Sequence, residues 1–172
     1  MLRIGGLTPL SWSDYPGKLA AVVYCQGCAW RCSYCHNQHL MPRKEAGRIA
    51  WSDVTDLLKR RRGLLDAVVF SGGEPTLQSG LAAAVAEVKA LGFLVGLHTA
   101  GIVPKHLQRL LPMLDWVAMD LKAPFETHHE VTGVAGSGRR AKESMELILA
   151  SGVACRFHTV HGNAQVVHAS RA

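Results

Sequence analysis

The sequence AAVVYCQGCAWRCSYCHN, residues Ala20–Asn37, joins a short apolar run to a loop that carries four of the chain's five cysteines. The AAVVY segment has the unbroken, β-branched apolar character of a buried strand. The residues before it lack the apolar core and the cleavage site of a secretory leader. In a reducing compartment, clustered thiols indicate metal or redox chemistry more than disulfides. We therefore expect a cytoplasmic protein with a cysteine site at the end of this strand.

Outward from this loop, apolar strands and helical segments alternate along the chain. Further strands are expected at Asp66–Phe70, Phe93–Thr99, Trp116–Pro124 and Cys155–Val160, and helices at 51–63, 81–92, 104–114 and 140–150. Ser52 is the expected N-cap of the first helix. Near-continuous apolar strands separated by helices are typical of a parallel sheet covered by helices. Because the chain is shorter than the roughly 250 residues of a full eight-unit barrel, we expect an α/β fold in one domain over residues 1–172, either a partial (β/α) barrel or an open doubly wound sheet.

Polar and glycine-rich segments follow the expected strands. They are the cysteine loop, SGGEP from Ser71, HTAG from His98 and DLKAP from Asp120. In both candidate architectures, ligands bind where the parallel strands end. We therefore expect these four segments to share one rim of the sheet and to form the functional site.

The composition argues against two classes of partner. The chain is 48% hydrophobic and 19% charged, with a formal charge of +6, which is typical of a globular protein. No apolar run approaches the roughly 20 residues of a membrane span. The basic run KRRR, Lys59–Arg62, has no interleaved aromatic residues and suits the end of a helix, where cations are favourable. We expect neither a membrane nor a nucleic acid as partner.

The spacing of the cysteines points to an iron–sulfur cluster. Cys28, Cys32 and Cys35 form C-x3-C-x2-C, and Cys25 precedes them. A zinc site made of two C-x2-C pairs usually separates them by about 15–20 residues, and ferredoxin runs order their gaps differently. Three thiolates on a tight loop can instead hold three irons of a [4Fe–4S] cluster and leave the fourth iron open to a ligand.

The motif, with Tyr34 just before its last cysteine, is the signature of the radical S-adenosylmethionine (radical SAM) enzymes. The sequence resembles the activating enzymes of glycyl-radical proteins, above all the anaerobic ribonucleoside-triphosphate reductase activating proteins, and also pyruvate formate-lyase activating enzyme. The matching segments span residues 14–124 and read DYPGKLAAVVYCQGCAWRCSYCHN, VVFSGGEPTLQ, GLHTAG and WVAMDLKAP. The resemblance implies a partial (β/α) barrel of the radical SAM type.

The resemblance also implies roles for residues of the rim. Cys28, Cys32 and Cys35 would bind a [4Fe–4S] cluster, whereas Cys25 is expected to be a buried apolar residue. Glycines lack a Cβ atom and let a ligand approach the backbone, which is the role implied for Gly72 and Gly73 with S-adenosylmethionine.

Further contacts with S-adenosylmethionine are implied along the same rim. Glu74 would pair with the amino group of the methionine part in a charge-assisted bond. Tyr34 and His36 would contact the adenine, with packing inside the loop as the alternative for His36. Asp120 and Lys122 would form an ion pair near the ribose or the carboxylate, or a purely structural pair.

A monovalent cation is bound near this position in pyruvate formate-lyase activating enzyme, and Thr99 and Asp120 match two of its ligands. His98, however, stands where the family often has aspartate. Hard cations prefer oxygen ligands to imidazole, so we do not expect a cation here. His128 and the four histidines after it show no regular ligand spacing and are expected to be solvated or packing residues.

The resemblance implies a radical SAM activase. An electron from a flavodoxin or ferredoxin would allow reductive cleavage of S-adenosylmethionine to methionine and a 5′-deoxyadenosyl radical, which would take a hydrogen atom from a backbone glycine of a partner enzyme, anaerobic ribonucleotide reductase. No general acid, base or nucleophile constellation is present, as expected when cofactors carry the chemistry. Two alternatives remain: a radical SAM enzyme acting on a small molecule, such as a deazapurine-forming synthase, and a non-catalytic iron–sulfur electron-transfer module that uses all four clustered thiols.

The C-terminal segment departs from the resemblance. HTVHGNAQVVHASRA, residues 158–172, starts like a strand of the family and then becomes unfamiliar. Family members usually continue with a further strand and helices, so the domain looks C-terminally short, whether natural, truncated or frameshifted. We expect one sheet edge and part of the ligand pocket to be open, with some loss of stability or activity.

Overall fold

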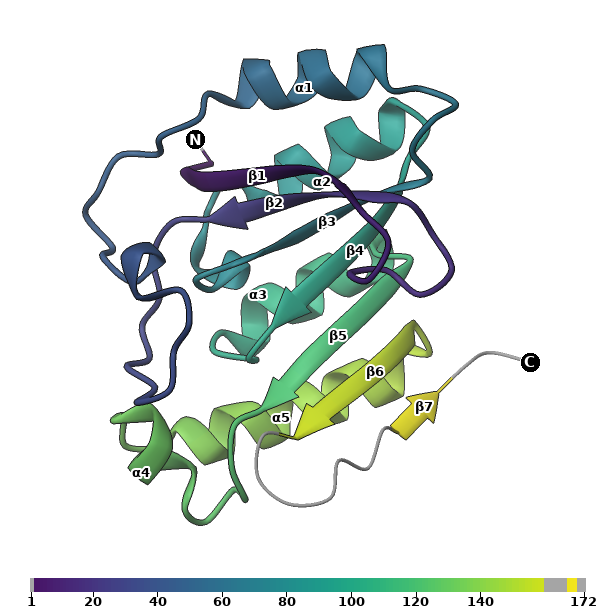
Figure 1. The fold of residues 1–172 in the computed structure, drawn as a ribbon. Helices are drawn as coiled ribbons and strands as arrows, with labels where there is room; N and C mark the ends of the chain where they lie inside the picture. Colours follow the sequence, from purple (N-terminus) through teal and green to yellow (C-terminus); the bar gives the residue numbers. More distant parts are fainter. Residues whose placement is uncertain (1, 160–166, 170–172) are drawn as a thin grey trace.

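The computed structural model describes residues 2–159 and 167–169, which form one seven-stranded sheet with the strands in sequence order (Figure 1). The strands are β1 (Ile4–Ser11), β2 (Ala20–Cys25), β3 (Ala67–Gly72), β4 (Leu94–Thr99), β5 (Trp116–Leu121), β6 (Ala154–Thr159) and β7 (Val167–Ala169). Strands β2 to β6 pair in parallel, and β1 and β7 pair antiparallel at the two edges. The predicted α/β fold with a parallel sheet is confirmed.

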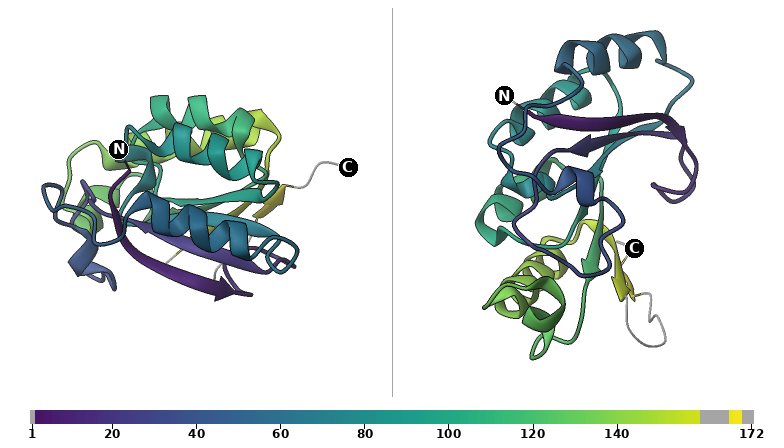
Figure 2. Two further views of the ribbon diagram at one scale, coloured as in Figure 1. Left: turned by 90° about the horizontal axis from the view of Figure 1, so that it is seen from above. Right: turned by 60° about the vertical axis from the view of Figure 1, so that its left-hand side comes forward.

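The helices lie on one side of the curved sheet (Figure 2). They are α1 (Trp51–Arg60), α2 (Leu81–Ala90), α3 (Pro104–Leu110), α4 (His128–Thr132) and α5 (Ser137–Ser151), with short 3-10 turns at Gln38–Leu40, Pro75–Leu77 and Leu111–Met113. The helices α1, α2, α3 and α5 each connect consecutive parallel strands, as the alternation of apolar and helical segments predicts. A curved parallel sheet with helices on its outer side is a partial barrel.

The two faces of the sheet are packed differently. Side chains of alternate strand residues, among them Val68, Phe70, Val95 and Val117, form the main core with the helices. The residues between them point to the inner face, and several of these are small, such as Ala20, Ala67 and Ala118. The two faces of a parallel sheet are usually both covered. Here a small aromatic cluster covers one end of the inner face, and a cavity opens at the other end.

The N-terminal segment supplies the aromatic cluster. Tyr15, in the connection between β1 and β2, is buried against the inner face, with its ring 5.2 Å from that of Trp116. Gly96 makes room for these two rings, because a Cβ atom there would lie 3.1 Å from Tyr15 and 3.3 Å from Trp116. The connection therefore closes the amino-terminal end of the partial barrel.

Some boundaries differ from the sequence-based expectations. Strand β1 was not expected, because IGGLTPLS combines glycines and a proline with few large apolar residues. Helix α4 was also missed, since five residues are too few to show a helical period. Ser52 is inside helix α1, which begins after Ala50 and has no side-chain cap. Val160, the last residue of the expected final strand, lies outside the described residues.

The register brings the four expected loops to one rim. Cys25 at the end of β2 pairs with Gly72 at the end of β3. Strands β4 and β5 end at Thr99 and Leu121, next to HTAG and DLKAP. In Figure 1 these ends, together with the long connection after β2, lie on the left side of the molecule. The sheet edge expected to be open at β6 is instead paired with β7 over Cys155–Phe157.

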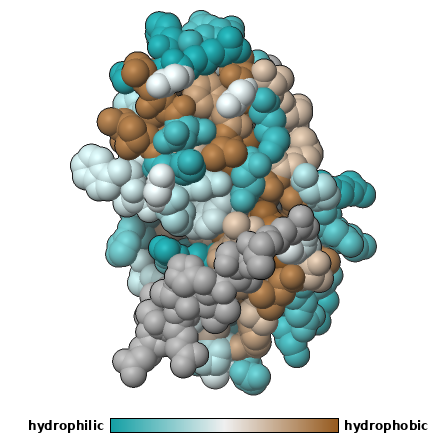
Figure 3. Space-filling model, turned by 90° about the vertical axis from the view of Figure 1, so that its right-hand side faces the viewer, coloured by the Kyte–Doolittle hydropathy of each residue, from teal (hydrophilic) through white to brown (hydrophobic). Residues whose placement is uncertain are grey.

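The opposite end of the molecule, where the parallel strands begin, is shown in Figure 3. Apolar residues gather over its upper half, next to hydrophilic residues at the top. Leu19 and Leu64, which flank the starts of β2 and β3, are 42% and 62% exposed. Within the described residues, no helix is both long enough and apolar enough to cross a membrane.

Candidate functional site

A cavity of about 340 Å³ opens at the carboxyl end of the sheet. Ten of the residues predicted for the site line it: Cys28, Cys32, Tyr34, Cys35, His36, Gly72, Gly73, Thr99, Asp120 and Lys122. Glu74 is the one predicted site residue that does not. The lining also includes Trp30, Asn37, Ser71, His98 and Ala100. The structure thus brings together segments that are separated by up to about ninety residues in the sequence, as the shared rim predicts.

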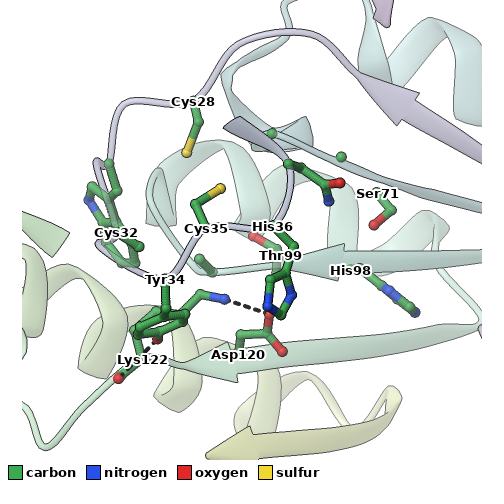
Figure 4. Close-up of a pocket in the computed structure, with 15 residues that line it drawn as sticks. Cys28, Cys32, Tyr34, Cys35, His36, Ser71, His98, Thr99, Asp120 and Lys122 are labelled. Atoms are coloured by element: carbon green, nitrogen blue, oxygen red, sulfur yellow. Dashed lines mark hydrogen bonds and ion pairs between the residues drawn. The ribbon is translucent and has the colours of Figure 1, made fainter. Parts of the chain in front are cut away.

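The cysteine loop is fixed to two neighbouring segments. The backbone N–H of Cys28 donates to Met41 O at 3.1 Å, and the N–H of Arg31 donates to Thr132 O at 2.9 Å. The side chains of Cys28 and Cys35 are directed toward one another across the upper part of the cavity (Figure 4). The loop therefore presents its thiols to the cavity from a tethered backbone.

Partial burial favours the protonated form of Cys28 and Cys32. Burial raises the pKa of Cys28 to about 11, and the nearby Cys32 and Cys35 also raise it, while the backbone N–H of Trp30 opposes this rise. Burial likewise raises the pKa of Cys32, although the ammonium of Lys122 lowers it. Because metals bind thiolates, loading this site would release protons.

An ion pair forms the wall opposite Cys28. Lys122 Nζ lies 2.8 Å from Asp120 Oδ2, and Tyr34 Oη donates to the backbone oxygen of Lys122 at 3.2 Å (Figure 4). Burial lowers the pKa of Lys122, but Asp120 outweighs it, so the net shift is upward and the ammonium stays charged. The side chain of Asp120 remains 46% exposed. The cavity therefore offers both a positive group and an accessible carboxylate.

The glycine pair follows β3 and is packed against the start of the cysteine loop. Gly72 has a φ of +109°, and a Cβ atom there would lie 2.5 Å from Cys25 N. A Cβ atom on Gly73 would collide with the carbonyl of Gly27. The N–H of Gly73 donates to Cys25 O at 2.9 Å. These glycines are required for the approach of the two loops, in addition to any approach of a ligand.

Glu74 does not line the cavity. Its side chain is fully buried and accepts hydrogen bonds from Thr76 N, Thr76 Oγ1, Thr99 Oγ1 and Ala100 N, at 2.6–3.0 Å. Burial raises the pKa of this carboxyl, and the hydrogen bonds oppose the rise. Glu74 thereby joins the loop after β3 to the loop after β4. That Glu74 pairs with the amino group of the methionine part of S-adenosylmethionine remains a prediction.

His98 lies at the inner end of the cavity, on β4. Its Nε2 is 2.8 Å from Asp14 O, and its ring makes an edge contact with Trp116 at 5.4 Å. A carbonyl oxygen only accepts, so Nε2 carries the hydrogen. Burial lowers the pKa of His98, although Asp14 and Asp120 raise it in part. That no hard cation binds beside His98 remains a prediction.

The thiols of the cavity fit an iron–sulfur cluster. Among the described residues, no three His, Cys, Asp or Glu side chains are grouped around one metal position. In a cluster each cysteine binds its own iron, so the thiols need only face one cavity, as Cys28, Cys32 and Cys35 do. Cys25 is fully buried in the main core and does not line the cavity. Three thiols without a fourth fit a cluster with one open iron.

A family model covers most of this chain. The model of the Radical SAM superfamily matches residues 22–164. The chain belongs to the Radical SAM superfamily. Radical SAM proteins use a [4Fe–4S] cluster and S-adenosylmethionine, which is the cofactor pair that the cysteine motif predicts.

Several curated relatives of this radical SAM chain are activating enzymes. A protein of Methanocaldococcus jannaschii, provisionally named a glycyl-radical enzyme activating enzyme, is 33% identical over 152 residues, 85% of this chain and 61% of its own length. The pyruvate formate-lyase-activating enzyme of Clostridium pasteurianum is 29% identical over 81% of this chain and 60% of its own. The pyruvate formate-lyase 1-activating enzyme of Escherichia coli is 30% identical over 77% of this chain and 57% of its own. This chain therefore spans at most about three-fifths of these relatives.

Solved structures share the radical SAM fold. QueE from Escherichia coli superimposes with a TM-score of 0.57 over 92% of this chain and 84% of its own, at 13% identity. SuiB of Streptococcus suis, in a structure bound to S-adenosylmethionine, gives a TM-score of 0.62 over 84% of this chain and 34% of its own, at 19% identity. At these identities the likeness concerns the fold, which confirms the predicted partial barrel of the radical SAM type.

Five lining residues were not predicted for the site, among them Trp30 and Ser71. Trp30 lies within the cysteine motif, and Ser71 directly precedes the glycine pair. Their place in the sequence could have indicated both. Residue type alone does not assign them to the site, because neither tryptophan nor serine is a typical metal ligand or carries a charge.

Proposed function

We propose that residues 1–172 act as one radical SAM domain that generates a glycyl radical on a partner enzyme. The observation that carries the proposal is the single cavity in which Cys28, Cys32 and Cys35 face the ion pair of Asp120 and Lys122. The activating enzymes among the relatives support the same reaction class. The partner that we propose is anaerobic ribonucleoside-triphosphate reductase, on the sequence motifs alone.

In this proposal the three cysteines hold the cluster. Gly72 and Gly73 give the methionine part access to the backbone, and Glu74 keeps its loop in place and is the candidate partner of the amino group. Tyr34 and His36, on the same loop as the thiols, take the adenine. A carboxylate and an ammonium at Asp120 and Lys122 are placed to bind hydroxyl or carboxylate groups of the ligand, with Thr99 beside them.

A [4Fe–4S] cluster held by Cys28, Cys32 and Cys35 would supply the one-electron reduction needed to cleave a carbon–sulfur bond of S-adenosylmethionine. The polypeptide binds and orients the cluster and S-adenosylmethionine, and it excludes water from the site. A flavodoxin or ferredoxin is the proposed electron donor. A cytoplasmic location completes the proposal, because thiols must stay reduced to bind iron.

The test is electron paramagnetic resonance of the anaerobically reconstituted, reduced protein, with and without S-adenosylmethionine. We expect a cluster signal that changes shape when S-adenosylmethionine is added, and 5′-deoxyadenosine among the products. A cluster signal indifferent to S-adenosylmethionine would contradict the proposal and favour an electron-transfer module.

The partner is tested separately. Anaerobic ribonucleotide reductase is added to the loaded protein with S-adenosylmethionine, and the glycyl radical is followed by its doublet signal. Formation of 5′-deoxyadenosine without a radical on the reductase would leave the radical SAM reaction intact and exclude this partner.

A further inference from the structure

Trp30 is anchored in the protein although it sits in the middle of the cysteine loop. Its side chain is 1% exposed and is the largest fully buried side chain among the described residues. It also lines the cavity together with Cys28 and Cys32, which flank it in the sequence. A loop whose central residue is buried has fewer conformations open to it than a loop held only at its ends.

His128 clamps the indole from helix α4. The two rings make an edge contact, with centroids 4.9 Å apart and planes at 70°. His128 is itself fully buried, and its Nδ1 lies 3.0 Å from Ser137 Oγ, which lies 2.8 Å from Thr132 Oγ1. This short chain of hydrogen bonds fixes the imidazole that the indole meets.

Helix α4 also holds the backbone of the loop just beyond the tryptophan. The N–H of Arg31 donates to Thr132 O at 2.9 Å, and the N–H of Ser33 donates to Val131 O at 3.4 Å. The helix therefore contacts the segment between Cys28 and Cys35 through a side chain and through the main chain.

The contact between the rings of Trp30 and His128 depends on their shapes and not on a hydrogen bond. Within the described residues, neither Trp30 Nε1 nor His128 Nε2 has a hydrogen-bond partner. A buried polar atom without a partner costs free energy, so the nitrogen atoms do not explain why these rings are paired. Replacement of the indole by an apolar ring should preserve the clamp, and its truncation should release it.

The tryptophan is linked to a predicted cluster ligand by its own backbone. The backbone N–H of Trp30 is near the Cys28 thiol and lowers its pKa, against the effect of burial. Hydrogen bonds to cysteine sulfurs are among the features that set the reduction potential of an iron–sulfur cluster. The orientation of this N–H follows from the conformation of the segment that the buried indole holds.

We propose that Trp30, clamped against His128, is a positioning residue for the cluster: it holds the segment between Cys28 and Cys32 in its binding conformation. This inference rests on the proposed cluster site. It assigns the short helix α4 the role of supporting the cysteine loop.

The test compares Trp30→Ala with Trp30→Phe, and with Trp12→Ala as a control, since Trp12 is 79% exposed. In the iron-free proteins, alkylation of Cys28 and Cys32 by iodoacetamide is followed by mass spectrometry. We expect roughly tenfold faster alkylation in Trp30→Ala, as when local opening becomes easier. Trp30→Phe and Trp12→Ala should match the wild type. Alkylation of the buried Cys25 reports any global unfolding.

The loaded proteins give a second readout. Trp30→Ala should show a broadened signal in electron paramagnetic resonance and a shifted midpoint potential, with Trp30→Phe restoring both. If Trp30→Ala loads a cluster with the wild-type signal, potential and alkylation rate, the positioning role is wrong. Should that variant fail to fold, His128→Ala and Trp30→Leu are judged by the same measurements. A wild type that takes up no cluster would contradict the proposed function itself, whatever the variants show.

Discussion

The cysteines of this chain differ in their surroundings more than in their spacing. Cys32 lines the cavity, whereas Cys25, at the end of β2, is fully buried in the main core. Burial strongly raises the pKa of Cys25, and the nearby Glu74 raises it further, so the protonated thiol is favoured at this position. The sequence places Cys25 outside the C-x3-C-x2-C motif, and the fold buries it as expected.

Replacing each of these two cysteines by serine should therefore have opposite results. We expect Cys32→Ser to lose the cluster and Cys25→Ser to retain it, with some loss of stability because a buried hydroxyl needs a hydrogen-bond partner. Iron and sulfide content and visible absorbance after anaerobic reconstitution measure this. Cluster loss in Cys25→Ser, with its fold intact by circular dichroism, would show that four thiols bind metal.

His98 should make stability depend on pH in the mildly acidic range. Burial lowers its pKa, and His158 lowers it further, against the opposing effect of Asp14 and Asp120. The unfolded chain then binds more protons between the folded pKa and the unperturbed value of about 6.5, so the free energy of unfolding rises with pH across that window. His98→Gln should flatten this rise in urea titrations of the iron-free protein, and the exposed His129→Gln should not. Equal slopes in all three proteins would contradict a buried neutral His98.

At the scale of single residues, the sequence predicts which residues form the site better than it predicts how their side chains are oriented. It predicts which residues reach the rim, and ten of the eleven named ones line the cavity. It does not predict that Glu74 is absent from the cavity lining. The donors to Glu74 at Thr76, Thr99 and Ala100 come from two loops, and only the fold determines that these loops lie together. The burial of Trp30 was missed for the same reason, since its partner His128 is remote in the sequence.

At the scale of elements, the loop after β3 and the loop after β2 form one unit. The N–H of Gly73 donates to Cys25 O and the N–H of Glu74 donates to Gly27 O, both at 2.9 Å. The glycine pair that the sequence assigns to ligand approach thus also sets the distance between two loops. Tight backbone contact of this kind is lost when a side chain is added at the contact.

Gly73→Ala should therefore loosen the rim. The added methyl group would meet the Gly27 carbonyl, a backbone group that cannot move aside without displacing the cysteine loop. We expect a loss of about 1–3 kcal/mol in unfolding free energy, the usual cost of overpacking, and weaker binding of S-adenosylmethionine to the loaded protein by calorimetry. Gly63→Ala is the control, because nothing lies within 4 Å of a Cβ atom there; its positive φ of +79° gives a backbone cost without a contact at the rim. Unchanged binding in Gly73→Ala would show that the approach of the two loops is not needed.

Elements with strong patterns were predicted from the sequence, and those with weak patterns were not. Strands β2 and β3 are built on the unbroken apolar runs AAVVY and AVVF, and β4 and β5 are largely apolar, so the parallel sheet and the rim follow from the sequence. Strand β1 and helix α4 are held by pairing and packing with distant residues instead. Ile4 pairs with Cys25, and Thr132 receives the N–H of Arg31. Such elements depend on tertiary contacts that no local window contains.

At the scale of the whole molecule, the cavity couples the ligand to the fold. Its lining comes from the cysteine loop and from the ends of β3, β4 and β5, so a ligand bound there touches most of the parallel sheet. A ligand that binds only the folded protein stabilises it by mass action, by about 2.7 kcal/mol at a hundredfold excess over Kd. For a domain of this size, 1 kcal/mol raises the melting temperature by about 2–4 °C.

S-adenosylmethionine should therefore raise the melting temperature of the loaded protein by about 5–10 °C at such an excess. It should raise that of the iron-free protein far less, because a [4Fe–4S] cluster with one open iron would provide the principal contact for the amino and carboxylate groups. Anaerobic differential scanning fluorimetry of both forms measures this, with Cys32→Ser as a chain that cannot be loaded. An equal shift in the loaded and iron-free proteins would mean that the ligand binds the polypeptide independently of the cysteines. The ion pair of Asp120 and Lys122 would then be the main anchor, and the three thiols would lose their place in the binding site.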